Sequence, residues 1–374
     1  MKYELKKILK IKSSYILLLF SLILMLIPIL FYSNQDDNYI ETMMLQSKID
    51  SLELTVRDTP TNDVHRKIIE NSKEELIIAR DYMDSLNSGD ADRLLYAELE
   101  YLETVNQNQL DMSKQGPNNI PNIDNKKVEL LEYLVNHDIE YVNSNFKLPT
   151  SNLLSGLFTL LFPPTALFLV FTLIAMNTFN FERYNNTYQI INTAPHSLVT
   201  FYFKKLTVTL IYIFLGFSLT FGIALVVNTF MHGFGDLNYP VQVVNDLGET
   251  NIISTLQFFL LGVGLSTTYL LFLIFFSFLL KVLTDNLIIN IVIIVLLIFL
   301  PYTNILTNIE FLNATYHFIP FSYGEAFYVV GNNGPSYISD NPDLTYTMGL
   351  IVTSIGALLS LTISMLIVYF RKKV

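Results

Sequence analysis

The order of hydrophobic and polar positions divides the chain into six long apolar runs separated by polar segments. No run contains Asp, Glu, Lys or Arg, and each is long enough for the roughly 20 residues that a helix needs to cross a bilayer core of about 30 Å. The runs cover residues 14–32, 153–176, 206–227, 252–280, 287–306 and 348–370. This pattern predicts an all-α, polytopic membrane protein with six transmembrane helices.

The composition changes this picture little and favours the same class. Hydrophobic residues make up 51% of the chain and charged residues 15%, whereas soluble domains carry about 25% charged residues. The chain has no cysteine, which excludes disulfides and thiolate metal sites. It also has no Trp but 22 Tyr and 28 Phe, so Tyr and Phe must supply the aromatic residues at the membrane interface.

Residues 1–32 are predicted to form an amphipathic helix followed by the first span. Residues 2–12 place lysines on one side of a helix and apolar residues on the other, which is typical of a helix in the membrane interface. The apolar run that follows is longer than the hydrophobic region of a secretory signal, and residues 33–36 lack the small residues of a cleavage site. We therefore expect a retained span.

The distribution of basic residues predicts the orientation of the helices. Lys and Arg mark the cytoplasmic side of short loops in bacterial membrane proteins. If the spans alternate, the N-terminal lysines, residues 179–205, Lys281 and Arg371 fall on one side, while segments 228–251 and 307–347 contain acidic residues and no Lys or Arg. We expect a multi-pass protein of the bacterial plasma membrane with both termini in the cytoplasm.

Residues 33–152 are predicted to form an acidic helical domain outside the cell. They contain 23 acidic and 11 basic residues, whereas the charges in the rest of the chain nearly balance. Apolar residues recur at helical spacing in four stretches, with Gly89 and the polar segment 116–124 between them. Two interpretations remain open: a helix bundle with an acidic solvated face, or a docking surface for a cationic ligand or a partner subunit.

Residues 153–374 are predicted to hold spans two to six, with two irregular features. Pro163 and Pro164 lie near the middle of the second apolar run, where they remove two backbone donors and kink the helix, either as a static kink or as a gating hinge. Residues 305–330 are aromatic and apolar but interrupted by Asn, Pro and Gly. We expect this segment to form a helical re-entrant hairpin that dips into the outer leaflet.

The chain lacks the patterns that indicate catalysis. Its five histidines are scattered, and it contains no HExxH zinc pair, no GxSxG elbow and no GxxxxGK[ST] phosphate loop. No ionisable residue lies at the centre of an apolar run, although carriers driven by ions or protons generally place one there. We therefore expect no enzyme activity, cofactor, metal or nucleic-acid partner in this chain, and an energy source outside the membrane segment.

The cytoplasmic residues 180–192 are predicted to form a short amphipathic helix outside the bilayer. Glu182 and Arg183 lie at its start, and four apolar residues recur at spacings of three, four and three: Phe181, Tyr184, Tyr188 and Ile191. Such a helix has two explanations. It lies in the lipid interface, or its apolar face docks into a groove of a cytosolic protein.

The residues around this stretch resemble the second cytoplasmic loop of ABC-2 type exporter permeases. Glu182, the short helix, Pro195 and Ser197 in a Pro-x-Ser turn, and Lys204 follow in the order typical of that family. The family often has a Gly before the Thr of this loop, whereas this chain has Asn186 before its Thr. The family also shares six spans, cytoplasmic termini, an N-terminal amphipathic helix and a broken extracellular hairpin between spans five and six.

The resemblance implies the permease subunit of an ATP-driven exporter of a hydrophobic or amphipathic substrate, either peptide or lipid-like. A separate cytosolic ABC ATPase would bind ATP and Mg, and would contact the 180–192 helix as its coupling element. The permease would pair in the lipid with a second copy of itself or a sister permease. The large insertion after the first span is similar to that of large-ectodomain members, several of which serve Gram-positive exporters of amphipathic peptides such as phenol-soluble modulins. The alternative is a non-transporting ABC membrane subunit that senses or transmits force through its ectodomain.

Overall fold

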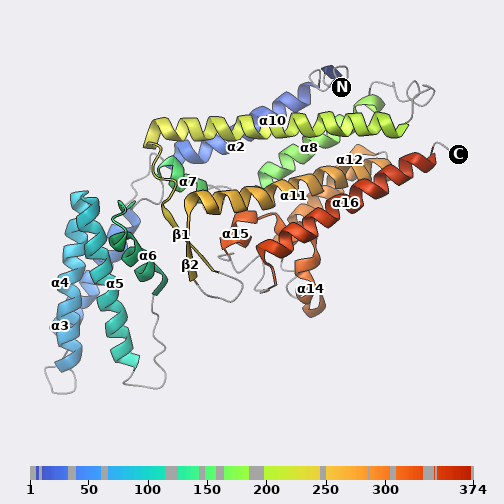
Figure 1. The fold of residues 1–374 in the computed structure, drawn as a ribbon. Helices are drawn as coiled ribbons and strands as arrows, with labels where there is room; N and C mark the ends of the chain where they lie inside the picture. The colour runs from blue at the N-terminus through green and yellow to red at the C-terminus, as the bar shows by residue number, and fades with distance from the viewer. Residues whose placement is uncertain are drawn as a thin grey trace. The chain divides into compact units, whose positions relative to one another are not determined.

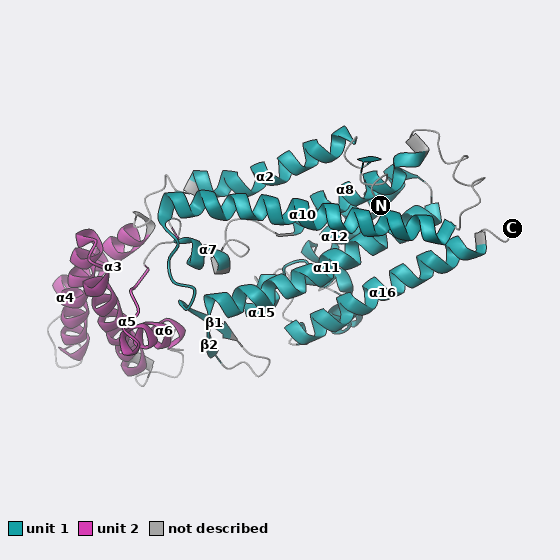
Figure 2. Cartoon of the chain, turned by 45° about the horizontal axis from the view of Figure 1, so that its top comes forward, with its two compact units in different colours: residues 1–31, 149–374 teal, residues 32–148 magenta. Residues whose placement is uncertain are grey.

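The computed structural model divides the chain into two compact units (Figure 2). Unit 1 comprises Met1–Phe31 and Pro149–Val374, and unit 2 comprises Tyr32–Leu148. The structure describes residues 6–7, 11–32, 39–59, 66–113, 125–142, 148–156, 164–184, 198–244, 250–284, 286–303, 309–331, 341 and 343–371. The borders expected from the sequence, at residues 33 and 152, lie close to this division.

Unit 2 consists, in its described part, of four helices around one apolar core (Figure 1). Leu45 and Ile49 pack with Ala79 and Leu94, and these residues lie on the apolar stripes of three of the helices. The helices are α3 (Tyr39–Asp58), α4 (Arg66–Ser88), α5 (Ala91–Ser113) and α6 (Asn125–Asn136). The helical periodicity of this part of the sequence is confirmed.

The turn between α4 and α5 follows from two residues. Gly89 has a φ of 71°, a left-handed conformation that glycine adopts without steric cost. Asp90 then caps α5, because its Oδ1 accepts a hydrogen bond from the backbone N–H of Arg93 at 3.2 Å.

Two buried carboxylates connect the helices of unit 2. Glu75 of α4 lies 2.8 Å from Lys48 Nζ of α3 and accepts a hydrogen bond from Asn108 Nδ2 of α5 at 3.0 Å. Glu98 of α5 pairs with Lys127 of α6. The acidic composition of this unit therefore has a structural component as well as a solvated one.

Among the described residues, unit 1 has five helices long and apolar enough to cross a membrane. They are α2 (Lys12–Tyr32), α8 (Pro164–Tyr184), α10 (Leu198–His232), α11 (Thr255–Thr284) and α16 (Tyr346–Arg371). A shorter apolar helix, α12 (Leu287–Phe299), continues into η2 (Leu300–Tyr302). A helical membrane protein is therefore supported, with five long helices and one shorter helix where six spans were expected.

Successive apolar helices run in opposite directions, so their ends alternate between the two ends of unit 1 (Figures 1 and 2). One end, here called the basic end, holds the starts of α2 and α10 and the ends of α8, α11 and α16. The Lys and Arg residues described in unit 1 all belong to the N-terminal segment or to helix termini at this end, namely Lys6, Lys7, Lys12, Arg183, Lys204, Lys205, Lys281 and Arg371. The opposite end, here called the acidic end, holds Asp236, Glu310, Glu325 and Asp343.

The second apolar run differs from its predicted form. α7 (Thr150–Gly156) covers its beginning, and α8 starts at Pro164 and continues well beyond residue 176. Pro163 lies outside the described residues. Pro164 is the first described residue of α8, a position where its fixed φ and missing N–H are tolerated. A gating role for this proline pair stays a prediction.

Unit 1 also contains one two-stranded β-hairpin within its otherwise helical described part, an element that the sequence did not predict. β1 (Pro240–Val244) pairs antiparallel with β2 (Thr250–Ser254), with Pro240 opposite Ser254. Both strands are rich in Val and Ile, which favour extended backbone. The hairpin follows Gly233, whose φ of 81° ends α10, and it leads directly into α11.

The described residues 309–331, between α12 and α16, form four short helices instead of a plain helical hairpin. These are α14 (Glu310–Ala314), η3 (Tyr316–Phe318), η4 (Pro320–Tyr323) and α15 (Ala326–Gly331). α15 packs closely on α11, where a Cβ added to Gly262 would lie 2.3 Å from the ring of Phe327. Residues 305–308 of the predicted hairpin lie outside the described residues, and its entry into the outer leaflet stays a prediction.

Candidate functional site

The predicted coupling residues begin in the last turn of α8. Phe181, Glu182, Arg183 and Tyr184 belong to this helix, so they continue a span instead of starting a separate helix over 180–192 as predicted. The helix extends because nothing in this stretch breaks it before Tyr184. Tyr188 and Ile191 lie outside the described residues. Glu182 is the member of this set whose buried contacts define a site.

Glu182 joins three parts of the chain at the basic end. Its Oε2 pairs with Lys205 Nζ of α10, and its Oε1 lies 3.5 Å from Nζ of Lys7 in the N-terminal segment. Lys205 Nζ also donates a hydrogen bond to the backbone carbonyl oxygen of Phe179 at 3.3 Å. The side chains of Lys205 and Glu182 are 2% and 5% exposed. We call Lys7, Glu182 and Lys205 the basic-end brace.

The burial of the brace determines how firmly it holds the helices. Removing one partner of a buried ion pair leaves an uncompensated charge and typically costs about 3–5 kcal/mol. Glu182 lies just before the end of α8, and Lys205 lies in the second turn of α10. The pair therefore joins the end of α8 to the beginning of α10.

Aromatic contacts extend the brace to a third helix. The ring centroid of Phe278 in α11 lies 5.3 Å from that of Phe179 in α8 and 5.6 Å from that of Tyr202 in α10. Lys7 Nζ lies 5.6 Å from the ring centroid of Phe201, within cation–π range. α8, α10, α11 and the N-terminal segment thus meet in one packed cluster.

The brace consists of one carboxylate between two ammonium groups, a set that holds helices together. In the part of the chain that the structure describes, no group of three or more His, Cys, Asp or Glu side chains is arranged to hold a metal ion.

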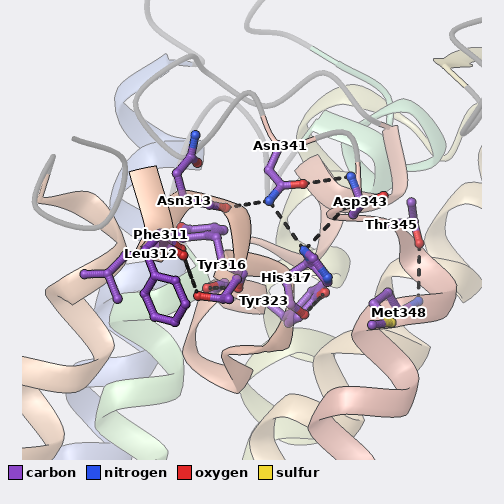
Figure 3. Close-up of polar contacts among 12 residues, drawn as sticks. Phe311, Leu312, Asn313, Tyr316, His317, Tyr323, Asn341, Asp343, Thr345 and Met348 are labelled. Carbon is purple, nitrogen blue, oxygen red and sulfur yellow. Dashed lines mark hydrogen bonds and ion pairs between the residues drawn. The ribbon is translucent and has the colours of Figure 1, made fainter. Parts of the chain in front are cut away.

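At the acidic end, a polar network ties the 309–331 segment to the residues that precede α16 (Figure 3). Asn341 Nδ2 donates to the backbone oxygen of Asn313 at 2.7 Å and lies 3.5 Å from His317 Nδ1. The same His317 nitrogen is 3.9 Å from Asp343 Oδ2, an ion pair when His317 is protonated. Tyr323 Oη donates to the backbone oxygen of His317 at 2.7 Å. The segment is therefore an integral part of unit 1.

Unit 2 has a cavity of its own, with a volume of about 420 Å³. Carboxylates from the start of α5 and from the residues after α6 surround it, and apolar side chains of both helices line it. The lining residues are Asp90, Ala91, Asp92, Leu95, Tyr96, Leu134, Val135, Asp138, Ile139 and Glu140. This cavity is the feature of unit 2 that best matches the predicted docking surface for a cationic ligand, which stays a prediction.

Sequence reasoning missed two features of unit 1. The first is the pairing of Glu182 with Lys205, for which a signal existed: Glu182 is the one acidic residue of the sequence segment 179–205, whose charged residues are otherwise Arg183, Lys204 and Lys205. The second is the burial of Glu325, which is 3% exposed. Its place in a segment predicted to lie outside gave no sign that the segment packs on α8 and α11.

Comparisons with known proteins identified no relative of this chain. No family model matches the chain, and neither a curated protein nor a solved structure matches it.

Proposed function

We propose that this chain is the membrane-spanning permease subunit of an ATP-driven ABC exporter in a bacterial plasma membrane. It moves a hydrophobic or amphipathic substrate, a peptide or a lipid-like molecule, out of the cell. ATP and Mg are bound by a separate cytosolic ATPase, because the chain has no phosphate-binding loop of its own. The observation that best supports the proposal is the basic-end brace, which joins α8, α10 and the N-terminal segment.

The brace supplies what a force-driven permease requires. The connection 185–197 carries Tyr188 and Ile191, whose apolar side chains dock on the ATPase in this proposal. Closure of the ATPase on ATP pushes the connection, and Glu182 and Lys205 pass the displacement to α8 and α10. A connection without such an anchor would absorb the push by bending.

The distribution of charge supports an orientation with the basic end in the cytoplasm. The Lys and Arg residues described in unit 1 all belong to that end, as the positive-inside tendency requires. Both termini then lie in the cytoplasm, unit 2 lies outside, and the ATPase meets the end that carries the brace. The partners in the membrane are lipid and a second copy of the chain or a sister permease.

One observation favours the second candidate, a non-transporting ABC membrane subunit that senses through its ectodomain. Unit 2 is a separate compact unit with an acid-rimmed cavity of its own. A sensor needs such a site, whereas an exporter does not. Accumulation of the substrate in a strain that lacks the chain distinguishes the exporter from the sensor.

The ATPase interaction is tested on the full-length protein, purified in mild detergent from its native membrane and assayed for a co-purifying Walker-type ATPase. The test variant is Tyr188→Asp, which places a charge on the proposed docking face. The matched control is Tyr96→Asp in unit 2, where the side chain is 58% exposed.

We expect the ATPase to co-purify with the wild type and with Tyr96→Asp but not with Tyr188→Asp. If no ATPase accompanies the wild-type chain, both ABC candidates are wrong. If Tyr188→Asp retains the ATPase fully, the 185–197 connection is not the docking element.

A further inference from the structure

Glu325 occupies an unusual place at the acidic end of unit 1. It precedes α15, is 3% exposed, and lies outside the apolar spans. Its Oε1 accepts hydrogen bonds from Thr165 Oγ1 of α8, at 2.9 Å, and from the Tyr302 hydroxyl of η2. The Thr165 and Tyr302 hydroxyls also contact each other. One carboxyl group thus joins the 309–331 segment to two apolar helices.

Two further oxygen atoms of this site have no hydrogen-bond partner among the described residues. They are Glu325 Oε2 and Tyr269 Oη of α11, and both are buried. A Cβ added to Gly324 would lie 3.2 Å from Tyr269 Oη and 3.3 Å from Thr165 Oγ1, so the hydroxyl of Tyr269 lies close to the Thr165 hydroxyl that donates to Glu325. The Glu325 carboxyl thus has one buried oxygen that accepts no hydrogen bond from the described residues.

No cation is at hand to balance a negative charge on Glu325. Among the described residues no Lys, Arg or His forms an ion pair with it, and the Lys and Arg residues described in unit 1 belong to the opposite end. The segments 245–249, 304–308 and 332–340 contain no Lys, Arg or His at all. A buried carboxylate without a cation is costly and becomes neutral by binding a proton.

We propose that Glu325, with Thr165, Tyr302 and Tyr269 around it, is a proton-binding site that latches the 309–331 segment onto α8, α11 and η2. The proton comes from solvent and resides on Oε2, so that this atom becomes a donor and Oε1 keeps its two hydroxyl donors. Loss of the proton leaves a buried anion without a counter-ion and weakens the packing of the segment. The site works independently of the ATPase-driven function proposed above.

The titratable groups that face Glu325 from the neighbouring elements are tyrosines. They are Tyr269 of α11 and Tyr302 of η2, and beyond them Tyr316 of η3; His317 of η3 is engaged with Asn341 and Asp343 instead. Burial raises the pKa of Glu325 to about 7, while the hydrogen bonds from Tyr302 and Thr165 oppose this rise. The site therefore changes its charge near neutral pH.

The raised pKa of Glu325 determines how the stability of the protein changes with pH. Because the folded-state pKa of about 7 lies above the ordinary value of 4.5, the folded protein binds the proton more tightly than the unfolded chain does. The stabilisation is fully present below about pH 4.5 and is lost as the pH rises through about 7. A carboxyl group with an ordinary or lowered pKa would not lose stability in this window.

Infrared spectroscopy of the full-length protein in detergent, between about pH 5 and about pH 9, tests the proton site directly because a protonated carboxyl has its own carbonyl stretch. We expect a carbonyl band at the low pH that disappears at the high pH, and its absence in Glu325→Gln. The matched control Glu310→Gln, an exposed acid of the same segment, keeps the band. Tyr302→Phe removes a hydrogen bond that lowers the pKa, so its band disappears at a higher pH.

The latch is tested by accessibility, which the absence of cysteine in the chain makes simple. Ser322→Cys places one thiol at a position 2% exposed in the segment. The rate at which a water-soluble thiol reagent labels this variant is compared with the rate for Ser322→Cys/Glu325→Gln. The fraction of thiolate rises with pH in both variants, so this effect cancels in the ratio of the two rates. We expect equal rates near pH 5 and at least about tenfold faster labelling with Glu325 present near pH 9.

Two results would overturn the proposal. If the carbonyl spectrum of Glu325→Gln equals that of the wild type at every pH tested, Glu325 is ionised throughout and binds no proton. If the band is assigned to Glu325 but the two labelling rates stay equal at every pH, the proton does not latch the segment. Should Glu325→Gln fail to fold, the direction of the Tyr302→Phe shift decides the first question.

Discussion

Replacing Lys205 with methionine removes the cation of the basic-end brace while it keeps a side chain of similar length. Glu182 then remains buried, with Lys7 Nζ still 3.5 Å from its Oε1. Breaking a buried ion pair costs about 3–5 kcal/mol. Because Lys7 compensates part of the charge, we expect a loss near the lower limit, about 3 kcal/mol. Lys204→Met is the matched control, since Lys204 is exposed and should change stability by less than about 0.5 kcal/mol.

The double variant Glu182→Met/Lys205→Met distinguishes an ion pair from ordinary packing. Replacing both partners with apolar residues removes the desolvation cost together with the attraction, and is often neutral or stabilising. We therefore expect the double variant to unfold within about 1 kcal/mol of the wild type, although each single variant is strongly destabilised. The assay is equilibrium unfolding of the full-length protein in mixed micelles, analysed as a double-mutant cycle.

Additivity is the result that would refute this reasoning. If the double variant loses the sum of the two single losses, the side chains contribute independently and the pair is no brace. If Lys205→Met and Lys204→Met have the same free energy of unfolding, the buried ion pair of Lys205 does not stabilise the protein. The connection 185–197 is then not anchored as proposed.

Two further changes test the packing of each unit. Gly262→Ala in α11 should lower the stability by about 1–3 kcal/mol, because the added Cβ would lie 2.3 Å from the Phe327 ring. The control Gly222→Ala has nothing within 4 Å of the added Cβ and should raise the stability by up to about 1 kcal/mol. Both variants are measured by thermal unfolding, and equal changes in stability would contradict the close contact. In unit 2, Glu98→Ala should cost about 1–3 kcal/mol, since Glu98 is 1% exposed and pairs with Lys127. The control is Glu100→Ala, at an exposed position of the same helix. The measurement is amide hydrogen exchange of α5, and equal exchange rates in the two variants would show that the buried carboxylate does not stabilise the unit.

Much of the architecture follows from local patterns. The absence of charge over long stretches indicates membrane-embedded helices because a lipid core leaves only a helix or a closed barrel able to satisfy the backbone. Helical spacing of apolar residues located α4 and α5, and Gly89 and Asp90 marked the turn between them. Alternation of basic and acidic segments predicted that the helix ends would segregate by charge, as they do in unit 1.

Other features could not be predicted from the sequence, because an apolar run does not specify where a helix begins or ends within it. The second apolar run was predicted as one span, whereas its described residues belong to two helices, α7 and α8. Val and Ile between α10 and α11 suit a strand or a helix, and pairing with a second strand decided for β1 and β2. Residues 181–184 fit a separate amphipathic helix but continue α8, since helical spacing does not specify which helix a residue joins.

The sequence by itself determined that this is a helical membrane protein with an acidic helical insertion, because charge depletion and helical periodicity are properties of neighbouring residues. Only the tertiary structure decided which charges are buried and with what. Glu182 meets Lys205 across 23 positions of sequence, and Glu325 meets Thr165 across 160. Such pairs form because helices fold back on one another, and the low polarity between the helices then converts each contact into a strong constraint or a proton site.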